Sequence, residues 1–329
     1  MILSRAPFRM SIGGGGTDLP SYYSRFGGFV LGAAIKQYVY VYVNRSAIDD
    51  YIRVKYSRAE EVKVIADIKH DLIRPTLELL NLGNSLEIVS MADLPSGTGL
   101  GSSSTYLVAT LLALLEYKRE HLSTQAVAEL ACNVEMNMAK HPVGKQDHYM
   151  AAFGGFTCMD IGRDGHVKVS HLNLSNSVME EFRNSVLLFY TGVTRSSHGI
   201  LQAQKADTEG DNPAVINSLH KTKEIGYRAK EAIESGDIES FGRLLDEHWQ
   251  NKKARSGAVS SPEIDEYYRL AKENGAVGGK IMGAGGGGFF MLYCPNGCKE
   301  RLRSNLTKAG LRELAYEFDL EGAKVLVNF

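Results

Sequence analysis

Glycine-rich backbone at three widely separated places is the feature that most limits what this chain can fold into. The three segments span residues 13–16, 97–101 and 283–288. Glycine adopts backbone conformations closed to other residues and lets a ligand approach the main chain, at an entropic cost that a simple turn does not require. We therefore expect these segments to hold a ligand, and their composition is typical of phosphate binding.

The middle segment belongs to the stretch DLPSGTGLGSSSTYLVATLLALL, residues 93–115, in which serines stand directly before a long apolar run. Serine is a preferred N-cap, and the N–H groups at a helix start carry a partial positive charge that suits a polyphosphate. No lysine follows the glycines as it would in a Walker motif. A buried helix after an ordinary turn is the alternative, but glycine at 97, 99 and 101 is more than a cap requires.

The two outer segments argue against the common nucleotide-binding motifs. The first is followed by Thr17 and Asp18 and comes after a strand that carries Arg5 and Arg9; a flexible hairpin loop is the alternative there. The third fits G-x-G-x-x-G, but a strand pattern over 289–293 follows it, whereas a dinucleotide-binding fingerprint must open a helix. The HRD and DFG signatures of protein kinases are absent from the sequence. A different nucleotide-binding architecture is therefore predicted.

A chain of 329 residues exceeds the size at which one hydrophobic core usually keeps growing, so we expect two domains, 1–180 and 181–329. The first begins with strands over 2–43 and continues with helices, and the second alternates helices with strands. The helices are expected over 103–116, 123–140, 199–206, 213–234, 237–253 and 262–274. Strands of the second part are expected at 185–190, 288–293 and 323–328.

Composition excludes several classes of partner. A formal net charge of -1 argues against a nucleic-acid footprint and against attraction to an anionic membrane. No apolar run approaches the roughly 20 residues that span a bilayer. The four scattered cysteines fit reduced thiols better than a disulfide scaffold or a zinc finger. We therefore expect a cytoplasmic, soluble protein.

Taken together, the three segments resemble the signature motifs of the GHMP kinases. The stretch from Pro95 to Ser104 matches that family's P-x-x-x-G-L-G-S-S-[AS] at every specified position. Residues 6–9 resemble the first motif, with Thr17-Asp18 spaced from Arg9 as in galactokinase, and residues 280–288 resemble the third. The resemblance covers the whole chain. It implies an α+β, two-domain GHMP kinase fold, with an ATP-binding N-terminal domain similar to ribosomal protein S5 domain 2 and a ferredoxin-like C-terminal α/β domain.

Within the superfamily, four stretches look most like the bacterial D-glycero-D-manno-heptose 7-phosphate kinases: GGGGTDLPSYY, VGKQDHYMAAFGG, YTGVTRSS and GGKIMGAGGGGFF. Galactokinases carry a Glu-His pair where this chain has Gly15-Gly16, which argues against galactose. The resemblance implies an ATP-dependent sugar kinase that phosphorylates the anomeric hydroxyl of the heptose 7-phosphate to give the 1,7-bisphosphate. That product would serve nucleotide-activated heptose synthesis for capsule, lipopolysaccharide or S-layer glycans. An L-fucose- or galactose-type sugar-1-kinase, or a non-catalytic sugar or nucleotide sensor, are the alternatives.

The resemblance also implies roles for individual residues. Asp147 would face the acceptor hydroxyl and take its proton, and Arg9 would neutralise charge in the transition state; a turn cap and a surface arginine are the alternatives. Magnesium would be held by Ser103 and Glu135, although Glu135 could instead be a surface acid, and its spacing to Asp147 is one residue longer than in mevalonate kinase. The ATP phosphates would be wrapped by Pro95, Gly97, Thr98, Gly99, Leu100, Gly101, Ser102, Ser103 and Ser104.

For the sugar, Asp18 would accept hydrogen bonds from hydroxyls, and Gly14, Gly15 and Gly16 would leave room for a longer substrate. Further substrate-binding candidates are Thr17, Lys145, Arg195, Gly285 and Gly286. A phosphate at the far end of the sugar needs a cation, and four remain open: Lys145, Arg195, Arg25 and Arg255. The partner is thus expected to be a small-molecule sugar phosphate, with a homodimer as a possible assembly.

Overall fold

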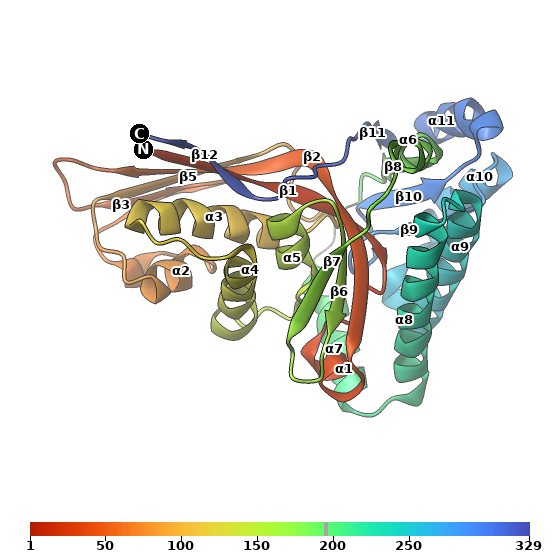
Figure 1. Cartoon of the computed structure of the whole chain (residues 1–329), viewed down its shortest axis with the longest axis horizontal. Helices are drawn as coiled ribbons and strands as arrows, with labels where there is room; N and C mark the ends of the chain where they lie inside the picture. The colour runs from red at the N-terminus through yellow and green to blue at the C-terminus, as the bar shows by residue number, and fades with distance from the viewer. Residues whose placement is uncertain (194–196) are drawn as a thin grey trace.

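Two β-sheets organise the residues that the computed structural model describes, 1–193 and 197–329 (Figure 1). The larger sheet has the order β12-β1-β2-β5-β3-β4, and β6 and β7 extend it from the other half of β2. Its strands are β1 (Ile2–Gly13), β2 (Gly28–Arg45), β3 (Ile52–Lys55), β4 (Ala59–Val62), β5 (Leu86–Ala92), β6 (Phe156–Ile161), β7 (Val167–His171) and β12 (Lys324–Asn328).

The long strands β1 and β2 form the centre of the larger sheet. They pair antiparallel from Ile2 opposite Val43 to Gly13 opposite Leu31. The last strand, β12, returns to pair antiparallel with β1, so the end of the chain closes the sheet in which it began. The division into 1–180 and 181–329 stays a prediction, and a single cut in the sequence cannot describe this returning strand.

The smaller sheet has the order β11-β8-β10-β9, and all its pairs are antiparallel. Its strands are β8 (Val186–Tyr190), β9 (Gly278–Ile281), β10 (Phe289–Tyr293) and β11 (Arg312–Leu314). Helices lie against both sheets: α1 (Pro20–Phe26), α2 (Ile73–Leu79), α3 (Ser102–Lys118), α4 (Thr124–Cys132), α5 (Gln146–Phe153), α6 (Asn176–Ser185), α7 (Ser197–Glu209), α8 (Pro213–Glu234), α9 (Ile238–Arg255), α10 (Pro262–Glu273) and α11 (Lys299–Lys308). This arrangement confirms the predicted α+β class.

Most helices expected from periodicity are confirmed, and their ends follow local capping chemistry. Helix α8 matches the predicted span because Asn212 caps it and Pro213 occupies its first position. The helix expected over 123–140 instead ends at Cys132 and continues as a π-helical turn, η2 (Asn133–Met138). Over the described residues, none of the helices is long and apolar enough to cross a membrane.

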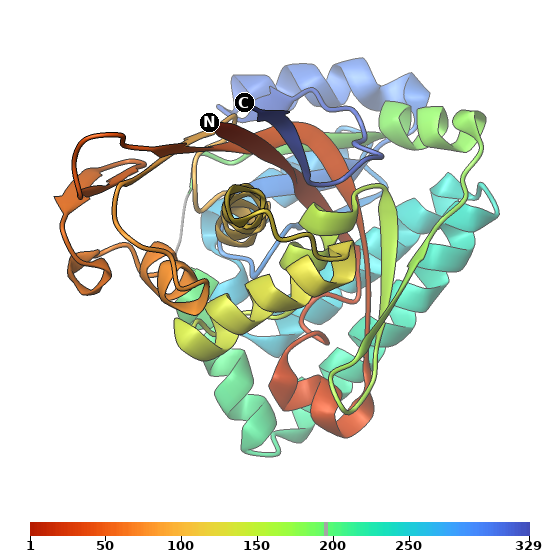
Figure 2. The same ribbon diagram turned by 60° about the vertical axis from the view of Figure 1, so that its left-hand side comes forward.

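Helix α3 is buried on all sides, as its nearly continuous apolar sequence predicts. It packs against β1 and β2 on one side and against α4 and α5 on the other. Figure 2 views it nearly along its axis, surrounded by these elements. Its N-cap is Gly101, and no side chain caps it, contrary to the expectation for the serines that follow. The first N–H groups of α3 therefore have no side-chain partner of this kind.

Helix α9 lies directly on the backbone of the smaller sheet. A Cβ built on Gly278 of β9 would lie 2.1 Å from the carbonyl oxygen of Gly242 and 2.7 Å from the amide nitrogen of Asp246, both on α9. Only glycine permits such a close approach of strand and helix. The contact sets the height of α9 above the sheet.

We expect Gly278→Ala to lower the free energy of unfolding by roughly 1–3 kcal/mol, because α9 must move away from β9. The midpoint of urea unfolding measures this. Gly83→Ala is the matched control, since nothing lies within 4 Å of a Cβ at that position. Equal midpoints for the two variants would contradict the packing described here.

Candidate active site

The three glycine-rich segments converge on one cavity of about 300 Å³. It lies between the first turn of α3, the start of α5 and the end of α9. The residues expected at a site from the sequence that line it are Arg9, Gly15, Gly16, Asp18, Gly97, Gly99, Gly101, Ser102, Ser103, Ser104, Asp147, Arg255 and Gly285. The structure therefore brings together residues from both ends and the middle of the chain.

The third glycine segment supports the second. A Cβ built on Gly283 would lie 3.0 Å from the Cα of Gly99, and one on Gly288 would lie 2.3 Å from the carbonyl oxygen of Thr98. The amide of Phe289 donates a hydrogen bond of 3.2 Å to that same carbonyl. The loop before α3 thus packs against the backbone of the third glycine segment and bonds to the first residue of β10.

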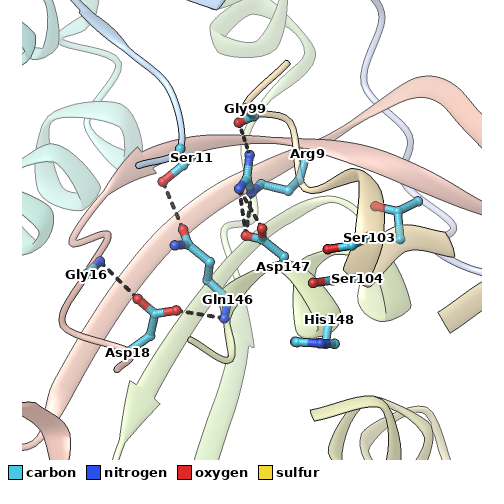
Figure 3. A network of polar contacts seen from close by, with 12 residues as sticks. Arg9, Ser11, Gly16, Asp18, Gly99, Ser103, Ser104, Gln146, Asp147 and His148 are labelled. Carbon is cyan, nitrogen blue, oxygen red and sulfur yellow. Dashed lines mark hydrogen bonds and ion pairs between the residues drawn. The ribbon is translucent and has the colours of Figure 1, made fainter. Parts of the chain in front are cut away.

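Arg9 and Asp147, which both line the cavity, form an ion pair (Figure 3). Arg9, on β1, is 2% exposed, and its Nε and Nη2 donate to the two carboxylate oxygens of Asp147, each at 2.7 Å. Its Nη1 donates to the carbonyl oxygen of Gly99, also at 2.7 Å. Such bidentate, charge-assisted pairs are strong and fix orientation. The side chain of Arg9 therefore joins β1 to helix α5 and to the glycine-rich loop before α3.

Gly101 leaves room for this pair. Its φ of 85° lies in the left-handed region, and a Cβ there would lie 3.1 Å from Oδ2 of Asp147. Both the backbone turn into α3 and the space for the carboxylate therefore favour glycine at this position.

Gln146 lies between Asp18 and the Arg9–Asp147 ion pair (Figure 3). Oδ1 of Asp18 accepts from the amide of Gly16 at 2.9 Å and its Oδ2 from the amide of Gln146 at 3.0 Å. Burial raises the pKa of Asp18, although those amide bonds act in the opposite direction. The side chain of Gln146 accepts a hydrogen bond from Ser11 at 2.9 Å. The carboxylate is thus fixed at the cavity wall by backbone donors.

Glu135 is fully buried next to the start of α3. The hydroxyls of Ser103 and Ser104 donate to its two oxygens at 2.7 Å each, and Nε2 of His148 lies 2.7 Å from Oε2. Burial alone would raise the pKa of Glu135, but hydrogen bonds from His141 and His148 and from Ser103 hold it well below its ordinary value. The surface-acid alternative does not hold. Ser103 is exposed to the cavity while Ser104 is buried.

Comparison with known proteins agrees with this geometry. Residues 62–155 match the GHMP kinases N terminal domain, and residues 229–310 match the GHMP kinases C terminal domain. The D-glycero-alpha-D-manno-heptose 7-phosphate kinase of Campylobacter jejuni is 30% identical over 338 residues, covering 98% of each chain. The chain belongs to the GHMP kinases.

Two solved structures of sugar kinases superpose on nearly the full length of this chain. A D-glycero-D-manno-heptose 1-phosphate kinase from Bacteroides thetaiotaomicron superposes with a TM-score of 0.83 at 26% identity, covering 100% of both chains. A putative sugar kinase from Campylobacter jejuni gives 0.79 at 28% identity, covering 99% of this chain and 98% of that one. This GHMP kinase is thus an ATP-dependent phosphotransferase with the two-domain fold of its family.

Several predicted site residues of the GHMP kinase support the loops without lining the cavity. Thr17 is buried and its hydroxyl donates to the carbonyl oxygens of Gly14 and Phe29, at 2.8 Å each. The hydroxyl of Thr98 donates to the carbonyl oxygen of Pro95 at 3.1 Å. Gly14, Pro95 and Glu135 also do not line the cavity, nor do Leu100, which is fully buried, and Gly286, whose amide donates to the carbonyl oxygen of Val259 at 2.7 Å.

Lys145 is expected from the sequence to face the substrate, but the structure directs it elsewhere. Its ammonium donates to both oxygens of Glu129 at 2.8 and 2.9 Å and to the carbonyl oxygen of Gly165 at 2.7 Å. The carboxylate on the neighbouring α4 attracts it away from the cavity. Arg195 lies outside the described residues.

The sequence did not single out several residues that line the cavity. Gln146 stands inside the GKQD stretch that carries the resemblance, so a signal for it existed. Lys252 belongs to the stretch NKKAR at a helix end, which resembles an ordinary solvated end with three cations. The other cavity residues without a predicted role are Leu19, Ser96, Val143, Gly144, His198, Leu201, Gln204, Met282, Gly283, Ala284 and Gly287.

We expect Asp147→Asn to lower kcat by roughly 10²- to 10⁴-fold, because an amide of the same shape cannot accept a proton from an acceptor hydroxyl. Binding of ATP should be nearly unchanged, and calorimetry with a non-hydrolysable analogue measures it. Asp211→Asn, at an exposed ion pair with Arg25, is the matched control and should retain its rate. An Asp147→Asn enzyme with a normal kcat would show that the carboxylate has no part in the transfer.

Proposed function

We propose that this GHMP kinase transfers the γ-phosphoryl group of ATP to the anomeric hydroxyl of D-glycero-D-manno-heptose 7-phosphate, giving the 1,7-bisphosphate. The observation that carries the proposal is full-length similarity to a Campylobacter jejuni protein that bears this substrate in its name. The Bacteroides relative is also named for a phosphorylated heptose, with the phosphate at position 1. Gly15 and Gly16 line the cavity, and a Cβ on Gly16 would lie 2.9 Å from Nε2 of Gln204 and 3.3 Å from Nη1 of Arg255, so their lack of side chains makes room for polar groups of the cavity wall. The product would enter the synthesis of a nucleotide-activated heptose.

The loop before α3 is proposed to hold the ATP phosphates. Gly97, Gly99 and Gly101 each have a positive φ, and the first turn of α3 has no side-chain cap. Backbone N–H groups at such a helix start attract a polyphosphate without a lysine. This part of the cavity therefore supports phosphate binding through the main chain.

Ser103 and Glu135 are proposed to hold Mg²⁺ together with the phosphates. Oγ of Ser103 and Oε1 of Glu135 lie 2.7 Å apart. Hydroxyl and carboxylate oxygens are ligands that Mg²⁺ prefers. Mg²⁺ usually takes only one or two protein ligands and keeps waters and substrate phosphate oxygens as the others. When bound, the ion would neutralise charge on the phosphates.

Asp147 is proposed as the group that receives the proton. The acceptor oxygen would form a bond to the γ-phosphorus, its proton would pass to the carboxylate of Asp147, and the bond from that phosphorus to the β–γ bridging oxygen would break to release ADP. Arg9 would hold the carboxylate in place and add positive charge next to the transferring group. Asp18 would accept hydrogen bonds from the sugar hydroxyls.

We expect Ser103→Ala to raise the Mg²⁺ concentration for half-maximal rate about tenfold, the effect of losing one charge-assisted ligand. A titration of Mg²⁺ at fixed ATP measures this. Ser123→Ala is the matched control, since it removes a serine that caps α4 away from the cavity. If Ser103→Ala only lowered the unfolding midpoint, as Ser123→Ala should, its role would be structural.

The acceptor is tested by turnover. We expect ATP consumption with D-glycero-D-manno-heptose 7-phosphate to exceed that with L-fucose, galactose or mevalonate by about 10²-fold or more in kcat/KM, because the transition state gains contacts that the others lack. The position of the new phosphate is read by ³¹P NMR. Robust turnover of another acceptor with none of the heptose phosphate would overturn the proposal.

A further inference from the structure

Two cations at the end of α9 face the cavity without a carboxylate partner among the described residues. Lys252 and Arg255 are three positions apart, which places them on the same side of the last helical turn. The guanidinium of Arg255 donates to uncharged oxygens only: Ser218 at 3.0 Å, Thr222 at 2.6 Å and Gln204 at 3.1 Å. These contacts orient the group but leave its charge uncompensated.

Lys252 adds to this positive charge. Its ammonium donates to the carbonyl oxygens of Gly283 at 2.6 Å and Ile281 at 3.2 Å. Burial, followed by repulsion from Arg255 and Arg9, lowers its pKa to about 7. Burial also lowers the pKa of Arg255 to about 10. A buried cation without an anion is unfavourable, so this end of the cavity is prepared for a negative ligand.

Arg255 lies beside the first glycine segment, which the proposed function assigns to the acceptor. A Cβ built on Gly16 would lie 3.3 Å from Nη1 of Arg255, and one on Gly15 would lie 3.6 Å from the amide oxygen of Gln146. Gln146 is the neighbour of Asp147 in the first turn of α5. The first glycine segment thus lies between Gln146, next to the proposed proton acceptor Asp147, and the guanidinium of Arg255.

Resting on the function proposed above, we propose that Arg255, reinforced by Lys252, binds the phosphate monoester that the sugar carries at the end remote from the reacting hydroxyl. A guanidinium presents parallel N–H donors that match two phosphate oxygens, and three of its five are already used to fix its plane. The phosphate would supply the missing negative charge. Arg255 would therefore determine specificity for a phosphorylated acceptor.

The other cations left open by the sequence do not reach this place. Lys145 is engaged with Glu129, and Arg25 pairs on the surface with Asp211 at 2.6 Å. Arg195 lies outside the described residues. Among the open candidates that the structure describes, only Arg255 lines the cavity.

The test compares two acceptors that differ only in the phosphate, D-glycero-D-manno-heptose 7-phosphate and D-glycero-D-manno-heptose, at saturating ATP. We expect Arg255→Gln to raise KM for the phosphorylated sugar about tenfold or more and to leave KM for the other sugar nearly unchanged. Arg255→Lys should recover part of the loss, since it keeps the charge but not the fork of donors. Arg243→Gln, an exposed arginine of the same helix, is the matched control and should behave as the wild type.

A loss of equal size against both sugars, or no loss, would overturn the proposal. If Arg255→Gln does not fold, Arg255→Lys gives the same comparison with a smaller change. A second measurement does not depend on turnover: inorganic phosphate, added with a saturating non-hydrolysable ATP analogue, should raise the melting temperature of the wild type and do so less for the Arg255 variants. If the wild type ignored the heptose phosphate but lost this phosphate response on substitution, only the proposed acceptor would fail. An equal response in all forms would overturn the role of Arg255.

Discussion

The ion pair between Arg9 and Asp147 sets the geometry on which the rest of the site depends. Arg9 is opposite Ala34 in the pairing of β1 with β2, so its position is fixed by the register of the central strands. A guanidinium that is 2% exposed must find its partners there, because an unpaired buried charge costs about 3–5 kcal/mol. Helix α5 and the loop at Gly99 supply them. In the folded chain these contacts bring the carboxylate of Asp147 to the loop before α3.

Glycine has two different functions in this site. At Gly97 and Gly101 the left-handed backbone shapes the loop in front of α3. At Gly283 and Gly288 the missing side chain lets the third segment pack against the second at backbone distance. The two functions cannot be separated in the sequence, where all glycines look alike. Gly285 and Gly286 were both expected to bind substrate, yet Gly285 lines the cavity while the amide of Gly286 donates to the carbonyl oxygen of Val259.

The sequence could predict a site residue only where the residues that identify it lie close together in the chain. The loop before α3 is contiguous, so its motif identified the family and most of the residues at one end of the cavity. Glu135 depended on spacing, and the additional residue before Asp147 is consistent with the π-helical turn η2, since such turns accommodate an extra residue within a helix. Lys145 and Lys252 depended on tertiary contacts alone. A carboxylate on α4 took the first from the cavity, and the packing of α9 on β9 brought the second to it.

The charged groups at the loop before α3 and at the end of α9 have different partners. At the loop before α3, the carboxylate of Glu135 is balanced by histidines, and the proposed phosphate donors are neutral N–H groups. At the end of α9 the guanidinium of Arg255 donates only to uncharged oxygens of the described residues, so a phosphate that is never transferred can serve there as an anchor throughout the reaction. On these assignments, binding energy from the anchored phosphate holds the reacting hydroxyl against Asp147, which is how a remote group of a substrate raises the rate at the reacting centre.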